Sequence, residues 1–275
     1  MKSDRLYRGL FRASLAALVL FASGLRADTA ADWLAKVPPP PRNADESQIL
    51  CSGYGDKYDS NKDLWRNLQP KLDAAKDAAQ KETQQKLQAA MGGDPAAIAA
   101  QQMAMMSDPG AMLQQQQQTL ELSQYQQTVF AGAPDAIADG MFTPAYNDAA
   151  DAVGQIVKAE NAKLTKCPMQ SGEAGDFPIP SCGNPIQHDA LGKKTAAVNA
   201  YLASIAKAWP PFTAKSKDYL GKLNSVPKDI DPKKLMAAQQ WLLSANATGL
   251  EGIDKMAKVS EDICGKANTL LNQNP

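Results

Sequence analysis

The sequence predicts an all-α fold, a multi-helix bundle of roughly six to eight antiparallel helices joined mostly by short turns. Apolar residues recur every three or four positions along much of the chain, which is the period of a helix with one buried face. Alternating β-branched runs, typical of strands, are essentially absent. Asp-Pro or Thr-Pro pairs, which favour a helix start, occur at 94–95, 108–109, 143–144 and 231–232.

The N-terminal segment has the pattern of a secretory signal peptide. Basic residues at 2, 5, 8 and 12 precede an apolar run at 13–21 and a small residue at Ala27. The apolar run is shorter than the ~20 residues that cross a bilayer. We therefore expect residues 1–27 to be removed by cleavage near Ala27, leaving a periplasmic or secreted chain without a membrane span.

The next segment, 28–58, is predicted to be an extended, proline-rich N-terminal arm. Four consecutive prolines at 38–41 favour the polyproline conformation, which suits a spacer. The remaining residues, 59–275, are expected to form a single helical domain. Only 6% of the residues are aromatic and much of the apolar content is alanine, so its core should be thin and made by helix packing.

The first half of this domain begins with a helix at 60–91, which Pro70 is expected to kink or split. A Met- and Gln-rich helical hairpin is predicted at 94–130, turning near Ser107 to Gly110. A third helical stretch covers 144–166. Its apolar stripe consists of Tyr146, Ala149, Val153, Ile156, Val157 and Leu164.

The second half contains a helix at 189–208, which the Trp-Pro-Pro-Phe sequence at 209–212 is expected to end. A short helix around 219–223 follows it. The longest predicted helix spans 233–271, and Gly249 and Gly252 are expected to be places where it could divide.

The chain has four cysteines, an even number that predicts disulfides in an exported protein. Four cysteines allow three pairings. We expect Cys167–Cys182, which would close the irregular Gly- and Pro-rich loop at 167–187, and Cys51–Cys264, which would tie the N-terminal arm to the last helix. No two cysteines have the close spacing of a zinc site or a thioredoxin-like motif.

The charge argues against nucleic acid as a partner. The chain carries 29 basic and 29 acidic residues, of which the leader at 1–27 holds five and one. The mature chain then has 24 basic and 28 acidic residues, a net charge of −4 without a basic block.

Residues 101–118, with the sequence QQMAMMSDPGAMLQQQQQ, raise two alternatives. Thioethers at Met103, Met105, Met106 and Met112 are soft ligands that could bind Cu(I), but the chain has one histidine, His188, and no nearby cysteine to complete such a site. Methionine also suits adaptable partner surfaces. We favour a partner-binding surface without a cofactor, made by Met103, Met106, Met112, Leu113, Leu120 and Tyr125.

Sequence motifs for catalysis are missing. His188 lacks a recognisable nucleophile or orienting acid, and neither the G-x-S-x-G nor the H-E-x-x-H pattern occurs. Two carboxylates brought together by the fold could still form a hydrolase site, which a sequence does not reveal. We expect a binding protein rather than an enzyme.

The exported, Ala- and Gln-rich, all-helical layout is similar to that of periplasmic components of secretion or conjugation machines, although no specific motif carries the likeness. The predicted function is protein–protein binding in the bacterial cell envelope, with another envelope or secreted protein as the partner. Periplasmic copper binding and an envelope hydrolase are the alternatives.

Overall fold

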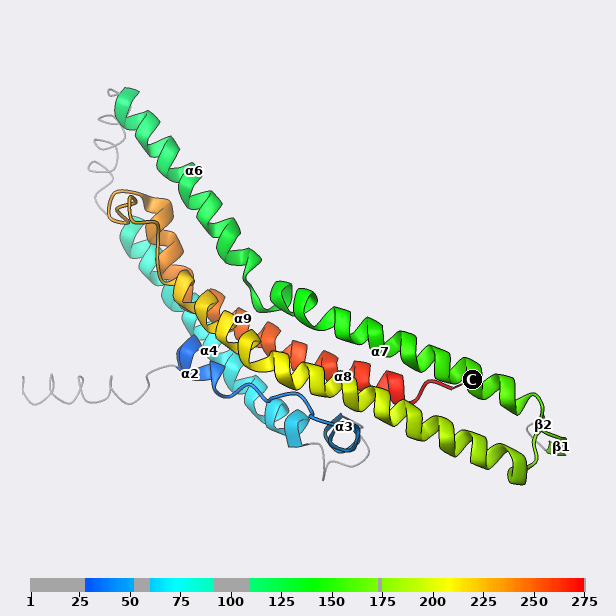
Figure 1. Ribbon diagram of the computed structural model, residues 1–275. Coiled ribbons are helices and arrows are strands. Elements are labelled where there is room, and N and C mark those ends of the chain that lie inside the picture. The colour runs from blue at the N-terminus through cyan, green and yellow to red at the C-terminus, as the bar shows by residue number, and fades with distance from the viewer. Residues whose placement is uncertain (1–27, 52–59, 92–108, 173–174, 275) are drawn as a thin grey trace, which may run out of the picture.

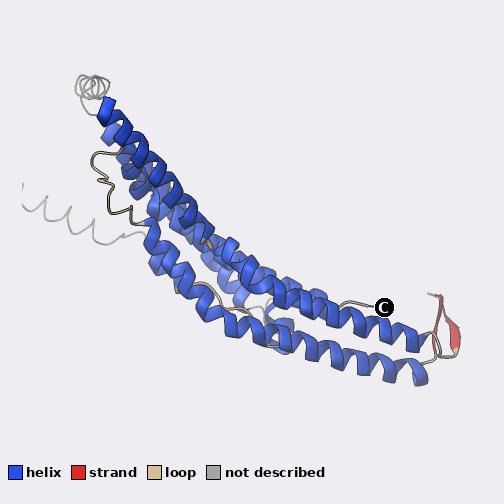
Figure 2. Cartoon of the chain, turned by 45° about the horizontal axis from the view of Figure 1, so that its top comes forward, coloured by secondary structure: helices blue, strands red, loops and turns tan. Residues whose placement is uncertain are grey.

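The computed structural model describes residues 28–51, 60–91, 109–172 and 175–274. It confirms the all-α prediction: these residues form seven helices and one two-stranded sheet. The molecule is a long, gently curved helical bundle (Figures 1 and 2). The predicted signal peptide and the first arm of the predicted hairpin lie outside the described residues.

Two long antiparallel helices, α8 (Pro180–Leu223) and α9 (Met236–Leu271), run through the middle of the bundle. Each contributes to two apolar clusters, one in each half of the molecule. Helix α7 (Pro134–Leu164) packs along both of them in one half, and α4 (Ser60–Met91) packs along α9 in the other. The fold is therefore a central helix pair with different covering helices at its two ends.

The half covered by α7 contains one of the two apolar cores. Val153, Val198, Leu202 and Ile205 are fully buried there, and Val153 belongs to the apolar stripe expected from the sequence. In the other half, Leu72, Ala75 and Ala79 of α4 face Trp241, Leu250 and Ile253 of α9. Small and medium side chains dominate both clusters, as the composition predicts.

Helix α6 (Pro109–Ala131) precedes α7 and leads away over the α4 end of the bundle (Figure 1). Its inner face inserts Val129 into the cluster with Trp241. Leu122 packs into a third, small cluster with Ile230 and Leu235. Only these two residues of α6 are buried, so this helix rests on the bundle by a narrow strip.

The N-terminal segment differs from the extended arm that the prolines predict. It contains two short helices, α2 (Ala30–Leu34) and α3 (Ala44–Cys51), that pack on the central pair. Trp33 is 1% exposed, and three of the four prolines at 38–41 are buried. Burial of an aromatic ring and of proline rings holds the segment against the bundle, where a sequence pattern alone predicts a free spacer.

The split expected at Pro70, the helix start expected at Pro144 and the helix end expected at Pro210 are not observed. Helix α4 continues through Pro70, α7 through Pro144, and α8 through Pro210 and Pro211. All four prolines are exposed, so their rings project from the helices into solvent and do not displace core side chains.

Two helices begin at residues different from those predicted. Helix α7 begins at Pro134 instead of Pro144, after the turn at 131–133. The Asp231–Pro232 pair forms a turn in which Asp231 Oδ1 accepts from the Lys233 N–H, and α9 begins at Met236. The description of α6 starts at Pro109, the proline of the Asp-Pro pair at 108–109.

Gly249 and Gly252 do not divide α9, which is continuous. They let neighbours approach closely: a Cβ at position 249 would lie 2.7 Å from the Ala30 Cβ, and one at 252 would lie 3.0 Å from the Tyr219 ring. The two glycines therefore allow α2 and α8 to pack closely on α9. The close contact comes at the cost of the low helix propensity of glycine.

The predicted Cys167–Cys182 disulfide is present, with 5.8 Å between the two Cα atoms. The loop is more ordered than expected, because strands β1 (Met169–Gly172) and β2 (Gly175–Pro178) form an antiparallel hairpin and α8 begins before Cys182. Cys264 is disulfide-bonded too. The Cys51 side chain lies outside the described residues, so the pairing Cys51–Cys264 stays a prediction.

None of the described helices combines the length and the hydropathy that a bilayer-crossing segment needs.

Candidate functional site

The first candidate is the side of α6 that points away from the bundle. We define the α6 outer face as Leu113, Gln116, Gln117, Leu120, Gln124 and Gln127, which are all exposed and lie within about 100° of arc at 100° per residue. Leu113 and Leu120 are each 61% exposed and stand seven residues apart, two helical turns. Met112 and Phe130 flank this face and are also exposed.

Charge is nearly absent from α6. Its sequence contains a single charged residue, Glu121, and the polar positions are mostly glutamine. Solvated helices usually carry charged residues of both signs on their outer side. The α6 outer face instead combines two leucines with uncharged amides, which are side chains that can be desolvated at modest cost.

Tyr125, predicted to bind a partner, contacts the bundle itself. Its hydroxyl lies 2.6 Å from Ser225 Oγ and donates to the Lys222 carbonyl at 3.0 Å. Its ring meets Trp241 edge to face, with 6.4 Å between the ring centroids. Tyr125 therefore anchors α6 to its own bundle. Its hydroxyl and ring, which were predicted to contact a partner, contact other residues of this chain instead.

Most of the predicted methionine cluster, namely Met103, Met105 and Met106, lies outside the described residues. Met112 lies on α6, 42% exposed. In the described ranges, no group of three or more His, Cys, Asp or Glu side chains could hold a metal. Copper binding stays a prediction, which a Cu(I) titration of the chain with all four methionines changed to leucine would test.

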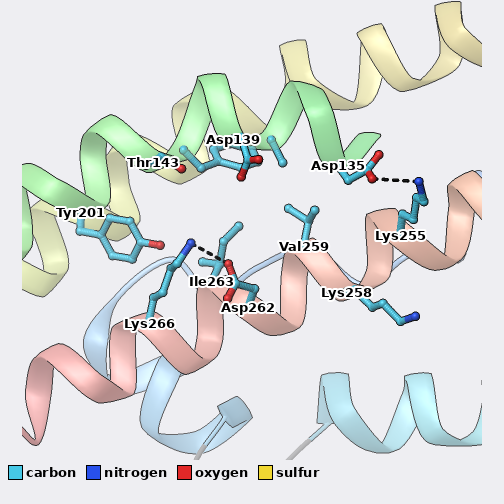
Figure 3. A pocket seen from close by; sticks show the side chains of 12 residues that line it. Asp135, Asp139, Thr143, Tyr201, Lys255, Lys258, Val259, Asp262, Ile263 and Lys266 are labelled. Carbon is cyan, nitrogen blue, oxygen red and sulfur yellow. Dashed lines mark hydrogen bonds and ion pairs between the residues drawn. The ribbon is translucent and has the colours of Figure 1, made fainter. Parts of the chain in front are cut away.

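The second candidate is a cleft between α7, α8 and α9 with a volume of about 340 Å³ (Figure 3). Helix α7 supplies Asp135, Asp139 and Thr143 to one side, and α9 supplies Lys255, Val259, Asp262, Ile263 and Lys266 to the other. Tyr201 closes one end from α8. Phe142 and Ala138 complete the apolar floor.

Ion pairs line the rim of the cleft. Lys255 Nζ lies 2.8 Å from Asp135 Oδ2 and connects α9 to α7, while Lys266 pairs with Asp262 at 2.7 Å within α9. The third lysine of the lining, Lys258, pairs with Asp254 at 3.0 Å. Asp139 lines the same cleft and has no ion pair with any described residue.

The Asp135 carboxyl is held in its ionised form. Burial opposes ionisation, but the hydrogen bond and the charge of Lys255, together with backbone hydrogen bonds at the start of α7, outweigh it and lower the pKa of Asp135 below its ordinary value. Asp135 is therefore a carboxylate at neutral pH.

Tyr201 is the most unusual group of the cleft. The residue is 2% exposed, and its buried hydroxyl has no hydrogen-bond partner among the described residues. Its ring packs edge to face on Tyr146, and the hydroxyl points into the space between α7 and α9 (Figure 3). Burial, with smaller contributions from Asp262 and Tyr146, raises the pKa of Tyr201, so the hydroxyl stays protonated at neutral pH.

A packed aromatic group supports the cleft floor. The Phe142 ring stacks on Trp209 with 6.1 Å between centroids and meets Phe212 edge to face at 5.1 Å. This contact fixes the floor on the side away from the rim charges. The cleft is thus a small apolar depression with one unpaired carboxylate and one unpaired hydroxyl.

The carboxyl groups of the described ranges can be compared with those of a hydrolase site. A glycosidase site needs one carboxyl whose pKa is raised so that it can act as a general acid. Every carboxyl group with a resolved shift in the described ranges has a lowered pKa, including Asp135 of the cleft. His188 is exposed on α8, away from the residues that line the cleft.

The sequence analysis missed the cleft, although two signals were present. Tyr201 interrupts an aliphatic stripe of α8, between Val198 and Ile205, which places a hydroxyl at a core position. Asp135, Asp139 and Thr143 recur every four residues and so share one face of α7. Because the helix was expected to begin at Pro144, these three residues were not predicted to share a helix face.

Comparison of the chain with protein-family models, with curated proteins and with solved structures finds no match.

Proposed function

We propose that the protein is an exported helical binding protein of the bacterial cell envelope, a component or accessory of an envelope-spanning machine. It holds a partner protein through the α6 outer face. The observation that carries the proposal is the exposure of Leu113 and Leu120, 61% each, on a helix with one charged residue.

An exposed apolar strip of this kind supports docking because covering it removes leucine side chains from water. The two leucines lie nearly in line along the helix, so a second helix laid against α6 would contact both at once. The surrounding glutamines can pair with amide or hydroxyl groups of the partner. The matching partner surface is an apolar helix with few charges.

The narrow attachment of α6 to its own bundle also supports this role. Leu122, Val129 and the Tyr125 hydroxyl hold the inner side of the helix, so the outer side is presented on a fixed support. A partner can bind there without opening the core, because the binding residues and the packing residues occupy opposite sides of α6.

Two further observations support a location outside the cytoplasm. The sequence at 1–27 has the order of a signal peptide, with basic residues before a short apolar run. The Cys167–Cys182 disulfide is of a kind that persists in oxidising compartments such as the periplasm.

A photo-cross-linking experiment tests the proposal in living cells. A photoreactive amino acid at position 117, on the α6 outer face, should give one discrete adduct with another envelope protein. The adduct should disappear when Leu113 and Leu120 are both changed to Gln, because the apolar strip is then lost. Removal of the whole segment 94–130 is a weaker test, since it also removes the core residues Leu122 and Val129.

The matched control is Leu191→Gln, which changes a leucine that is 49% exposed on α8. It should leave the adduct at position 117 unchanged. An adduct that survives the double substitution, or one made equally from position 191, contradicts the proposal. An adduct with twice the mass of this chain would identify a second copy as the occupant and also contradict it.

A further inference from the structure

A groove between α2, α8 and α9 has the size of a small-molecule site. Its volume of about 780 Å³ is inside the range of ligand pockets, roughly 300 to 1,000 Å³. The short helix α2 forms one wall and packs against both central helices (Figure 1). The walls of the groove are therefore held in place by the fold.

Small side chains keep the groove open. Ala31 and Ala35 of α2 and Gly221 of α8 line it and are all exposed, and Leu34 beside them is partly exposed. A Cβ built at Gly221 has no neighbouring atom within 4 Å, so open space lies beside this glycine. A ligand in the groove therefore has direct access to methyl and methylene groups, which favour an apolar body.

The charge of the lining is positive. Among the described residues, the groove has one charged side chain, Lys217, which is exposed and has no ion pair with another described residue. The neighbouring Lys222, by contrast, pairs with Asp218 at 2.7 Å. The two amides of the lining, Asn224 and Asn246, are neutral, and each already makes a hydrogen bond within the fold. The lining therefore favours an anionic group at Lys217.

The length of the groove determines the shape of the ligand. Lys217, Gly221 and Asn224 line the groove at intervals of four and three residues, so they share one side of α8. They span two helical turns, about 10 Å at a rise of 1.5 Å per residue. An extended chain of several methylene groups covers this distance, and each methylene that leaves water favours binding.

We propose that this groove binds a linear aliphatic carboxylate of the fatty-acid type. The carboxylate pairs with Lys217, and the chain lies over Leu34, Ala35 and Ala31. An aliphatic ammonium would meet Lys217 and would find no carboxylate in the described lining to pair with. The inference does not depend on the proposed role of α6.

The test is a titration of the full, oxidised chain with octanoate, followed by the shifts of backbone amide NMR signals. Signals of α2 and of residues 217–224 should move and saturate, and octylammonium at the same concentrations should leave them unchanged. Butanoate should bind more weakly than octanoate, because each methylene that is buried raises the affinity by up to about fourfold.

Two substitutions locate the binding groups. Gly221→Leu fills the groove and should weaken octanoate binding by more than about tenfold. The fold should be at least as stable, because the new side chain enters open space and replaces glycine inside a helix. Lys217→Gln should raise the dissociation constant about fivefold, the upper end for an exposed ion pair. Far-UV circular dichroism and the unfolding midpoint check that both variants are folded.

Each substitution has a matched control on α8. Gly192→Leu also adds a side chain at a glycine with open space beside it, but Gly192 does not line the groove. Lys215→Gln removes an exposed lysine that lies two residues from Lys217, about 200° around the helix. Both controls should bind octanoate as tightly as the native chain.

Three results would overturn the proposal. The first is that Gly221→Leu or Lys217→Gln binds octanoate as tightly as the native chain. The second is that octylammonium binds as well as octanoate. The third is that no signal of the groove moves up to millimolar octanoate.

Discussion

Helices α6 and α7 follow each other in the chain, and both lie on the central pair, yet they are held in different ways. Helix α7 buries seven of its 31 residues, and the side chains it places in the core are as large as Phe142. Helix α6 buries two of its 23 residues and leaves Leu113 and Leu120 in solvent. The apolar residues of α7 therefore build the core, whereas two leucines of α6 lie outside it and are available for other contacts.

The difference in packing should be largest for aromatic residues. Phe142→Ala on α7 should lower the free energy of unfolding by about 3 to 5 kcal/mol, because it removes a buried ring from the aromatic group. Phe130→Ala on α6 should cost less than about half as much, since Phe130 is 46% exposed and contacts mainly Trp241. Urea denaturation measures both, and equal losses would show that α6 is as firmly packed as α7.

A buried ion pair is a second feature of the α7 half. Glu160 on α7 and Lys194 on α8 are each 5% exposed, with 3.8 Å between Lys194 Nζ and Glu160 Oε2. Lys194→Met should destabilise the protein by about 3 to 5 kcal/mol, because it leaves a buried carboxylate without its cation and removes a hydrogen bond to the Gln273 carbonyl.

The control for the buried ion pair is the exposed pair beside it, Lys193 and Asp189. Lys193→Met breaks the pair with Asp189 but should cost under about 1 kcal/mol, since both side chains are about half exposed. Adding Glu160→Leu to Lys194→Met should recover most of the loss, because no buried charge remains. A thermal or urea double-mutant cycle that shows no recovery would argue against the buried charge as the cause.

The disulfide at the tip of the α7–α8 hairpin should have an effect of intermediate size. Replacing Cys167 and Cys182 with Ser opens a loop with a sequence separation of 15, which the chain-entropy model values at about 3 kcal/mol. Hydrogen exchange should increase at the end of α7 and the start of α8 and stay unchanged in α6. Faster exchange in α6 as well would mean that the two halves unfold as one unit.

The fold class and most buried positions could be predicted from the sequence because they depend on local periodicity. Leu72, Val153, Leu202 and Ile263 occupy stripe positions and are buried. The helix start expected at Pro144 and the helix end expected at Pro210 are wrong, because tertiary packing along the rest of a long helix can offset the cost of an exposed proline, which the local sequence does not show. Cys167–Cys182 was found because sequence proximity limits the possible pairings.

The candidate sites could be predicted only in part. The exposure of Leu113 and Leu120 follows from a helix with few apolar anchors, which is a local property. The cleft depends on Asp139, Tyr201 and Ile263 meeting from three helices, which is a property of the tertiary structure. Tyr125 was assigned to a partner because its contact with Ser225, 100 residues away, has no trace in the local pattern.

The smallest expected effect concerns pH and the Asp135–Lys255 bridge, an interhelical ion pair of the α7 half. Since the pKa of Asp135 is lowered in the folded state, the bridge stabilises the fold above the ordinary aspartate pKa, near 4, and this contribution is lost as pH falls through the lowered value. Asp135→Asn should cost under about 1 kcal/mol at pH 7, because both side chains are about half exposed.

The stability difference between the native chain and Asp135→Asn should therefore shrink as pH falls from 5 toward 2, and should also shrink in high salt. Asp148→Asn, an exposed aspartate of α7 with no ion pair to a described residue, should show no such pH-dependent difference. A difference that persists at pH 2 would mean that the Asp135 side chain acts through packing or through the start of α7. In that case the rim of the cleft would not depend on the bridge.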